Sequence, residues 1–492
     1  MSLKKILFPL FCILTAAISL HAQPAAKPVK KPQPLDLKVH INGLKGGECL
    51  LGYHYGDKNA IIDTAKVDAN GWMHFTDTAM PGGIYFVLLP NKKYFEIILT
   101  DNQKFTVETD TVDFIRSMKV TGNKENQYFY EYLNYLSTQQ KLVEPIQAQM
   151  KKTKNKDTLA MLQKKSAAID STVKVYKRAY YKTKHPETFM AKVLSAMDEP
   201  DQVSYSKSPR KPDGTIDSSY NYRNFRAHYW DGMDFSDERL LRTPVYTNKM
   251  KFYMEKLTSP HPDSIMKAAD WLIEKTRASD ELFKYTLSTL TVQYETSKVM
   301  GYDAIFVHFV DKYYKTNQAT WITEDQKKKI IDRSNQLSYT LLGKNAVNLM
   351  MKDSAGRMQI LQGVQAKYTV VIFWEPTCSH CKKEIPMLKT YYDSLRAAGV
   401  SFEVYAIRSD MDSVNWKAFI KEHNLTWINV AARDGQELAT AKYYYDVYST
   451  PTLYLVDEKK TFIGKRLDID GLKSVLNRKI EQDKKSAGKK PN

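Results

Sequence analysis

Two cysteines separated by two residues constrain this chain more than any other feature of its sequence. Residues 373–386 read FWEPTCSHCKKEIP and contain Cys378 and Cys381. A Cys-x-x-Cys pair is half of a metal site, a structural disulfide or a redox centre. The apolar run TVVIFW before the pair predicts a buried strand, and the residues after it are compatible with a helix. The pair is therefore expected where a strand passes into a helix.

The first 22 residues predict a secretory signal peptide. Lys4 and Lys5 form a short basic region, residues 6–20 are largely apolar, and Ala22 is the small residue that precedes the expected cleavage site. The apolar stretch is too short for a comfortable membrane span, and a retained N-terminal anchor is the alternative. We therefore expect an exported protein in the periplasm of a Gram-negative bacterium, with the signal cleaved after Ala22.

The number of cysteines narrows the interpretation of the pair. Cys12 lies inside the signal, so the mature chain keeps Cys49, Cys378 and Cys381. Three thiols are too few for a disulfide-stapled scaffold, and a four-thiolate zinc site needs a second pair. We therefore predict that Cys378 and Cys381 take part in a chemical reaction. Cys49 lies on an alternating strand pattern and is predicted to be a buried core thiol, with a resolving or partner-linking thiol as the alternative.

The chain is basic, with 492 residues and a formal charge of +18, which falls to about +16 without Lys4 and Lys5. No segment resembles a nucleic-acid-binding motif, and export makes nucleic acid an unexpected partner. The two remaining interpretations are a solvated basic surface and peripheral attraction to anionic envelope surfaces or acidic partners.

Composition and periodicity divide the chain into regions. At roughly 100–200 residues per domain, the length predicts about two to four domains. The predicted order is a signal peptide (1–22), a Pro- and Lys-rich linker (23–34), an all-β sandwich (35–120), an all-α helical domain (121–340), an α/β domain (341–485) and a disordered tail (486–492).

The β-region has period two, and Asn70-Gly71 predicts a hairpin turn between Val67 and Trp72. The helical region has apolar residues at helical spacing, and a Pro-rich stretch over 198–222 predicts a long loop. Its aromatic stripe is interpreted as core, with a client-binding face as the alternative. His308 on that stripe is likewise interpreted as a core histidine rather than a ligand.

The α/β region alternates strands and helices around an expected central sheet. Strands are predicted for TVVIFW, SFEVYAI, TLYLV and KTFIGKR, and helices for residues 387–398, 413–423 and about 470–482.

A helix that starts at or just before Cys378 would give that thiol a particular chemistry. Unpaired N–H groups and the positive end of the helix dipole both favour the thiolate. Cys381 follows one turn later on the same side, where it is shielded and can resolve a mixed disulfide. A partly positive His380 ring would stabilise the thiolate further and make the disulfide more oxidising. A solvated histidine is the alternative interpretation of His380.

The pattern F-W-x-x-x-C-x-x-C-K-K-E-x-P resembles the thioredoxin superfamily, and within it the exported TlpA/ResA branch. Gly343-Lys344-Asn345-Ala346 is similar to the opening segment of such domains, and Thr450-Pro451-Thr452 to the loop that carries a cis-proline. The resemblance covers about residues 340–485 and implies a thioredoxin-like fold. Residues 35–340 resemble, in architecture only, N-terminal modules of exported Bacteroidetes-type proteins.

The resemblance also implies roles for individual residues. Cys378 matches the attacking thiol, Cys381 the resolving thiol and Pro451 the cis-proline. Trp374 matches the aromatic residue beside the site, and Glu384 the acidic residue that tunes the pair, for which a solvated glutamate is the alternative. Pro386 matches the proline that kinks the active-site helix. Val456-Asp457 and the following hairpin match the closing strands.

The chain departs from the family pattern at several positions. Ile372 stands where thioredoxin itself has a buried aspartate, so proton transfer to Cys381 must use water or Glu384. Val347 replaces a frequent proline. Ser379-His380 differs from the Gly-Pro of thioredoxin and argues against a strongly reducing potential.

The function expected from the sequence is a periplasmic thiol-disulfide oxidoreductase, an enzyme that exchanges disulfides with protein clients and an unidentified redox partner. We expect a reductase, since the Lys-Lys-Glu pattern follows the branch that reduces apocytochromes, although His380 argues the other way. No cofactor and no metal are expected. The main alternative is an envelope binding or scaffold protein with a secondary redox domain. A peroxidase is disfavoured because Pro376-Thr377-Cys378 is too compact, and a metal chaperone because Cys378, His380 and Cys381 lie too close together.

Overall fold

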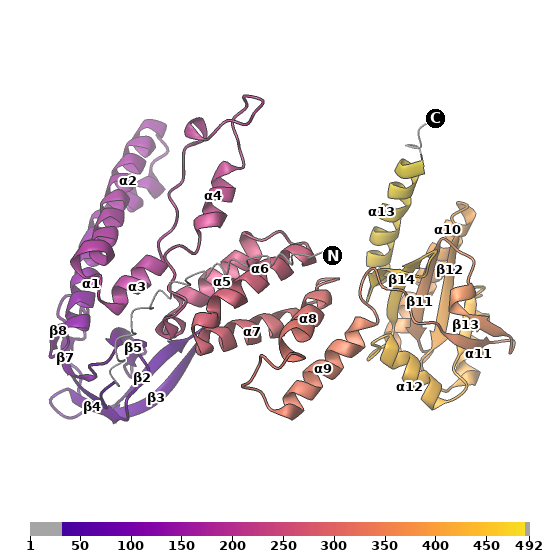
Figure 1. Cartoon of the computed structure of the whole chain (residues 1–492), viewed down its shortest axis with the longest axis horizontal. Coiled ribbons are helices and arrows are strands. Elements are labelled where there is room, and N and C mark those ends of the chain that lie inside the picture. The colour runs from indigo at the N-terminus through magenta and orange to yellow at the C-terminus, as the bar shows by residue number, and fades with distance from the viewer. Residues whose placement is uncertain (1–31, 488–492) are drawn as a thin grey trace, which may run out of the picture. The chain divides into compact units, whose positions relative to one another are not determined.

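The computed structural model describes residues 32–487, which fall into two compact units divided between Leu194 and Ser195 (Figure 1). The predicted signal peptide and the linker up to residue 31 lie outside the described residues. Among the helices of residues 32–487, none has the length and apolar character needed to cross a membrane.

The first unit begins with two four-stranded sheets, ordered β4-β1-β7-β8 and β3-β2-β5-β6. One apolar core draws on strands of both sheets, so the predicted β-sandwich is confirmed. Cys49 lies in β2 within this core, fully buried, as predicted. The strands are β1 Leu35–Asn42, β2 Glu48–Tyr55, β3 Lys58–Lys66, β4 Trp72–Asp77, β5 Gly83–Leu88, β6 Tyr94–Leu99, β7 Lys104–Asp110 and β8 Lys119–Thr121.

The predicted hairpin at Asn70-Gly71 is only half right. The turn is present, because the Gly71 N–H donates to the Asp68 carbonyl, but β3 and β4 belong to different sheets. Gly71 has a φ of +86°, and a Cβ built on it would lie 2.5 Å from the Ile41 carbonyl oxygen. The Ile41 N–H donates to the Gly71 carbonyl. This close backbone approach directs β4 onto β1 instead of back onto β3.

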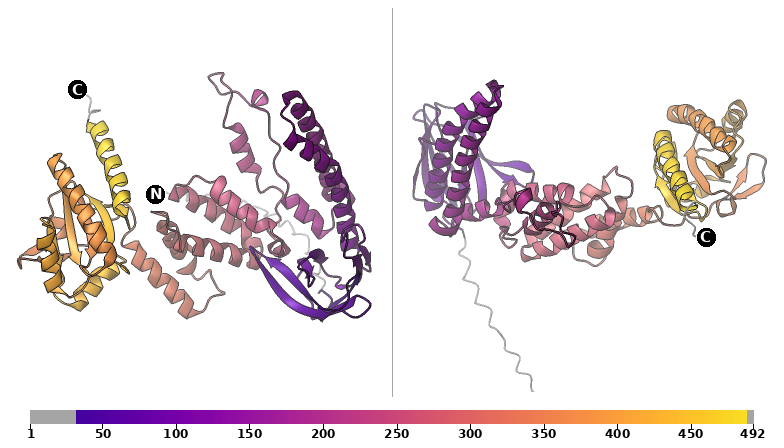
Figure 2. Two further views of the ribbon diagram at one scale, coloured as in Figure 1. Left: turned by 180° about the vertical axis from the view of Figure 1, so that it is seen from behind. Right: turned by 90° about the horizontal axis from the view of Figure 1, so that it is seen from above.

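Two long helices belong to the first unit and a third crosses its end at Leu194, and Figures 1 and 2 show the two long ones side by side. The helices are α1 Lys124–Lys152, α2 Lys156–Ala179 and α3 Phe189–Ala196. The fully buried side chain of Asn126 joins α1 to the sandwich, since its amide accepts from the Ile98 N–H and donates to the Ile98 carbonyl. These contacts place the first helices with the sandwich, so the division between the compact units falls inside the predicted helical region.

The second unit continues with helices in which the apolar stripe is core. Ile305, Phe306 and Phe309 are fully buried, and His308 is half-buried and hydrogen-bonded to Asp270. The predicted loop over 198–222 contains one short helical turn, and α4 begins near its end. The helices are α4 Tyr220–His228, α5 Val245–Lys256, α6 Pro262–Lys275, α7 Asp280–Glu295, α8 Asp303–Phe309 and α9 Glu324–Ser338.

The C-terminal part contains a seven-stranded sheet in the order β10-β9-β13-β12-β11-β14-β15. The three central strands β13, β12 and β11 are parallel, and their neighbours β9 and β14 are antiparallel to them. The strands are β9 Met350–Asp353, β10 Met358–Ile360, β11 Tyr368–Trp374, β12 Phe402–Arg408, β13 Ile428–Ala431, β14 Thr452–Asp457 and β15 Phe462–Lys465.

Helices cover both faces of this sheet, as Figure 2 shows. One core contains side chains of α10, α11 and α13, and the other contains α12 and the segment before β11. The helices are α10 Ser379–Ala397, α11 Ser413–Glu422, α12 Gly435–Tyr444 and α13 Ile469–Ala487. The predicted α/β fold is thus confirmed. The last helix reaches two residues into the predicted tail, whose residues 488–492 lie outside the described range.

Candidate functional site

The cysteine pair lies where β11 passes into α10. All seven residues of β11 are buried, because this central strand has helices on both faces. The chain leaves the sheet at Trp374, and Cys378 is the residue immediately before α10, with extended dihedral angles. Its carbonyl accepts the first helical hydrogen bond, from the Lys382 N–H. The predicted strand-to-helix junction is confirmed.

Cys378 is partly exposed, and its surroundings favour the thiolate. Burial raises the pKa of its thiol, but hydrogen bonds from the backbone N–H groups of Cys381 and His380 and contacts with the side chains of Thr450 and Cys381 outweigh burial. The pKa of Cys378 therefore lies below its usual value. The helix N-terminus supplies these free N–H groups, as at other reactive cysteines.

Cys381 has the opposite environment. It is fully buried in the first turn of α10, and burial raises the pKa of its thiol to about 12, with the neighbouring Cys378 adding to the effect. A thiol of this kind is protonated and unreactive until a nearby electrophile or base reaches it. The two cysteines are thus differentiated into an accessible nucleophile and a shielded second thiol.

The loop before β14 touches the exposed thiol. The Thr450–Pro451 bond is cis, as the motif predicts. The Cys378 Sγ donates to the Thr450 carbonyl oxygen at 3.3 Å. The Thr450 hydroxyl in turn donates to a Glu375 carboxylate oxygen at 3.1 Å. The loop and the segment that precedes the pair therefore brace each other beside the nucleophile.

Trp374 and Ile372 are residues of β11, the strand that precedes the cysteine pair. Both side chains are fully buried in the core that also contains Cys381. The Trp374 ring contacts the Phe419 ring, with centroids 5.1 Å apart. The role of Trp374 beside the redox pair stays a prediction, and Ile372 offers no group to exchange a proton with Cys381.

His380 and Glu384 lie on the outward side of α10. The His380 ring is exposed. Glu384 is half-buried, and burial together with the charge of Asp468 raises the pKa of its carboxyl, while His380 and Lys383 partly offset that rise. Glu384 and Asp468 line one recess with Pro451. The roles of His380 and Glu384 in tuning the pair stay predictions.

Several residues at the site had no role assigned from the sequence. Glu375, Thr450 and Asp468 touch or line the site through loops whose approach no periodic pattern reveals. Thr450 had one signal, its place before the predicted cis-proline. Within residues 32–487, no cluster of three His, Cys, Asp or Glu side chains could hold a metal ion.

The different environments of the thiols predict a large difference in reactivity. At pH 8, a pKa of about 12 leaves about one Cys381 in ten thousand as thiolate. Iodoacetamide should therefore label Cys378 at least about 100-fold faster than Cys381 in the reduced protein, with a pH midpoint below that of a free cysteine. Peptide mapping after timed quenching measures both rates.

Cys49 serves as an internal control for this experiment. It is fully buried, and burial raises the pKa of its thiol to about 11. It should react only after addition of denaturant. Faster labelling of Cys381 than of Cys378 would contradict the assignment of the nucleophile.

Comparison with protein families gives three matches along the chain. Residues 365–462 match a family described as thioredoxin-like. Residues 199–340 and 35–129 match two families described as domains of unknown function, DUF5106 and DUF4369. The thioredoxin-like match contains Cys378, Cys381 and Pro451.

Individual relatives match about a quarter of the chain. The thiol-disulfide oxidoreductase ResA of Bacillus thuringiensis subsp. konkukian is 28% identical over 117 residues, which are 24% of this chain and 64% of that protein. The chain thus spans just under two thirds of the length of this relative.

Two solved structures are also similar to parts of the chain. A domain of a possible thiol-disulfide isomerase from Cytophaga hutchinsonii is 36% identical, with 30% of this chain and 97% of that chain covered and a TM-score of 0.27. A thioredoxin-like protein from Bacteroides caccae is 20% identical, with 56% of this chain and 99% of that chain covered and a TM-score of 0.43.

Proposed function

Because residues 365–462 belong to the thioredoxin-like family, we propose that the protein is a thiol-disulfide oxidoreductase that exchanges disulfides with protein clients through Cys378 and Cys381. The observation that carries the proposal is the contrast between the two thiols. Cys378 is accessible with a lowered pKa, and Cys381 is buried one turn away with a raised pKa.

The reaction has two steps. The Cys378 thiolate attacks one sulfur of a client disulfide, the client S–S bond breaks, and the other client sulfur leaves as a thiolate. Cys381 then gives its proton to water or to the client thiolate released in the first step and attacks Cys378 Sγ. The bond between Cys378 and the client breaks, the Cys378–Cys381 disulfide forms, and the second client sulfur leaves as a thiolate. Two electrons pass from the pair to the client. A dithiol reductant must restore the pair for the next cycle.

Reductase is the proposed direction in the cell. The Lys-Lys-Glu sequence after Cys381 is similar to that of the ResA branch. The N–H groups around Cys378 stabilise the reduced form and act in the opposite direction, since they make the disulfide more oxidising. Equilibration of the Cys378–Cys381 pair with glutathione measures its reduction potential and tests the proposed direction.

We further propose that the protein works in the periplasm. The basic and apolar segments up to Leu20 support export, and N-terminal sequencing of the protein from a periplasmic fraction should begin at Gln23. The net positive charge supports peripheral attraction to the anionic envelope. The clients are proposed to be proteins with exposed disulfides.

Reduction of insulin tests the proposed function. The full-length protein, recycled by dithiothreitol, should accelerate the precipitation of insulin B chains at least about tenfold over dithiothreitol alone, because the lowered pKa of Cys378 increases the fraction of its thiol that is present as the reactive thiolate. Heat-inactivated protein is the control for nonspecific nucleation.

The same experiment distinguishes the scaffold alternative. The observation that favours a scaffold is that residues 35–129 and 199–340 match two families of unknown function. A protein that leaves insulin unreduced and whose Cys378 resists iodoacetamide would contradict oxidoreductase activity and support a binding role.

A further inference from the structure

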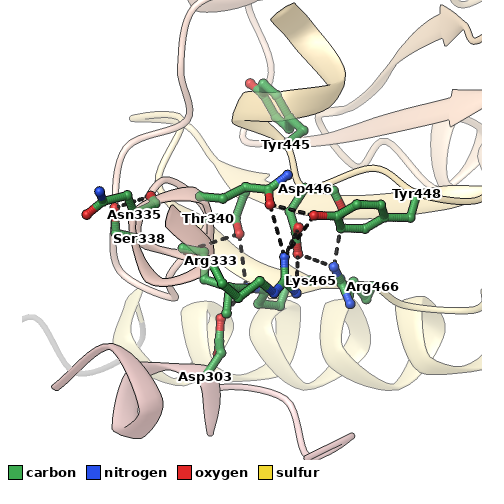
Figure 3. Close-up of polar contacts among 12 residues, drawn as sticks. Asp303, Arg333, Asn335, Ser338, Thr340, Tyr445, Asp446, Tyr448, Lys465 and Arg466 are labelled. Carbon is green, nitrogen blue, oxygen red and sulfur yellow. Dashed lines mark hydrogen bonds and ion pairs between the residues drawn. The ribbon is translucent and has the colours of Figure 1, made fainter. Parts of the chain in front are cut away.

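Helix α9 and the cis-proline loop are joined by an ion-pair cluster around Asp446, which Figure 3 shows. Asp446 is the second residue after the end of α12, has a φ of +51°, and its carboxylate is fully buried. Arg333 of α9 binds both carboxylate oxygens with its two terminal nitrogens. Arg466, after β15, donates to the same carboxylate and to the Asp446 carbonyl. A bidentate arginine–carboxylate contact of this kind fixes the orientation of the two side chains as well as the distance between them.

Tyr448 extends the cluster toward the redox site. Its hydroxyl accepts from Arg333 at 3.2 Å and donates to the Gln336 side-chain oxygen at 2.5 Å. The Arg333 guanidinium also lies 5.4 Å from the centre of the Tyr448 ring. The ring itself is 71% exposed. Two residues on consecutive turns of α9 therefore hold an aromatic side chain that faces solvent beside the site.

The segment held in this way, residues 446–452, is short and contacts the nucleophile Cys378. Thr450, two residues after Tyr448, provides the carbonyl that accepts from the Cys378 Sγ. Tyr448, Pro451 and Glu384 line one recess. Because the loop touches Cys378 through Thr450, a protein disulfide that reacts with Cys378 should contact more of this loop than a small disulfide does.

The connection of the helical region to the C-terminal domain has a second, separate component. Lys465 pairs with Asp303 and donates to the Thr340 hydroxyl at 3.0 Å. The Lys465 N–H donates to the Met300 sulfur, and Met300 packs against the same core as Cys381. Loss of Arg333 would therefore leave these contacts in place, and Arg466 would still neutralise Asp446.

We propose that Arg333 and Gln336 are positioning residues, which hold residues 446–452 in the place that a protein disulfide needs in order to reach Cys378. The helical region is thereby part of the reaction apparatus rather than a separate module. The inference rests on the proposed function and deepens it, because it assigns α9 a role in the choice between protein disulfides and small disulfides.

The test compares two disulfides in full-length variants. The reduced protein is mixed with insulin or with 5,5′-dithiobis(2-nitrobenzoate), and the second-order rate constant of each reaction is measured. Arg333→Met should lower the rate constant with insulin about tenfold, and Tyr448→Phe about threefold, since small misplacements of a reacting surface have large kinetic effects. The rate constant with the small disulfide should fall less than twofold, and Arg333→Lys should lie between Arg333→Met and wild type.

Arg433→Met is the matched control. Arg433 is 68% exposed and pairs with Glu437 on the surface of the same domain. This variant should react with both disulfides as wild type does. Tyr448→Phe keeps the ring and the buried ion pairs, so it remains folded if Arg333→Met does not.

Three results would overturn the inference. Rate constants with insulin within twofold of wild type in both variants would show that α9 does not position the loop. An equal fall with both disulfides would show a general loss of structure instead of positioning. A wild-type protein that reacts with neither disulfide would overturn the proposed function and this inference with it.

Discussion

Cys378→Ser is expected to lower the rate of insulin reduction at least about tenfold, to the background of dithiothreitol alone. A serine hydroxyl is not ionised near neutral pH and cannot form the mixed disulfide. The second thiol cannot substitute for the first, because Cys381 is fully buried and its pKa is raised to about 12. Turbidity at 650 nm with the full-length variant measures the effect.

Cys381→Ser should lose turnover to a similar extent but for a different reason. Cys378 still attacks, and without the second thiol the mixed disulfide persists. Non-reducing electrophoresis should therefore show a covalent adduct with insulin that dithiothreitol removes. The same variant recovered from cells would carry its protein clients as adducts.

Cys49→Ala is the control for both variants. Cys49 lies in the core of the β-sandwich and is fully buried. It should support insulin reduction at the wild-type rate. Full activity of Cys378→Ser, or an adduct formed by Cys378→Ser and not by Cys381→Ser, would reverse the assigned order of the thiols.

Asp303→Ala is expected to destabilise the second unit by about 3–5 kcal/mol, because it leaves a buried ammonium without its partner. The Lys465 side chain is 5% exposed and pairs with Asp303. Urea denaturation near pH 7 measures the free energy of unfolding. Asp303→Ala combined with Lys465→Met removes both charges and should recover most of the loss.

The effect should depend on pH. Burial holds the pKa of Lys465 below its usual value, since desolvation of the ammonium outweighs the attraction of Asp303. Removal of Asp303 lowers that pKa further. The unfolded chain, with a lysine pKa of about 10.4, then binds more protons than the folded one, so stability rises with pH. The loss in Asp303→Ala should therefore be largest near pH 7 and smaller at pH 9.5.

Asp393→Ala gives a comparison within the same domain. Asp393 is 56% exposed and pairs with Lys389 one helical turn away. An exposed pair of this kind contributes less than about 1 kcal/mol. A loss in Asp303→Ala no larger than in Asp393→Ala would show that the Lys465 ammonium is solvated in the absence of its partner.

Some elements could not be predicted because their sequence signal is weak. Helix α12 buries only Leu438 and Ala441, so its apolar pattern has a single repeat. Strand β13 has four residues, too few to establish a period. Both are stable because the sheet and the second core surround them, which is a property of the folded domain rather than of the segment.

The local sequence determined the redox site and the fold class. A buried strand, a short turn and a helix start follow from the residues around Cys378, and these alone supply the N–H groups that lower its pKa. The cis-proline followed from a motif within the same domain. Such features depend on neighbours in the chain, so periodicity and motif spacing report them.

Only the tertiary structure decided what holds the loop beside the nucleophile. Arg333 and Asp446 are 113 positions apart, and Asp303 and Lys465 are 162 apart. In the sequence, each is one of many charged residues on a helix or loop, and nothing nearby marks its partner. Pairing arises when packing excludes water around a carboxylate and brings one or two cations within reach of it, and that depends on which surfaces meet, not on the order of residues along the chain.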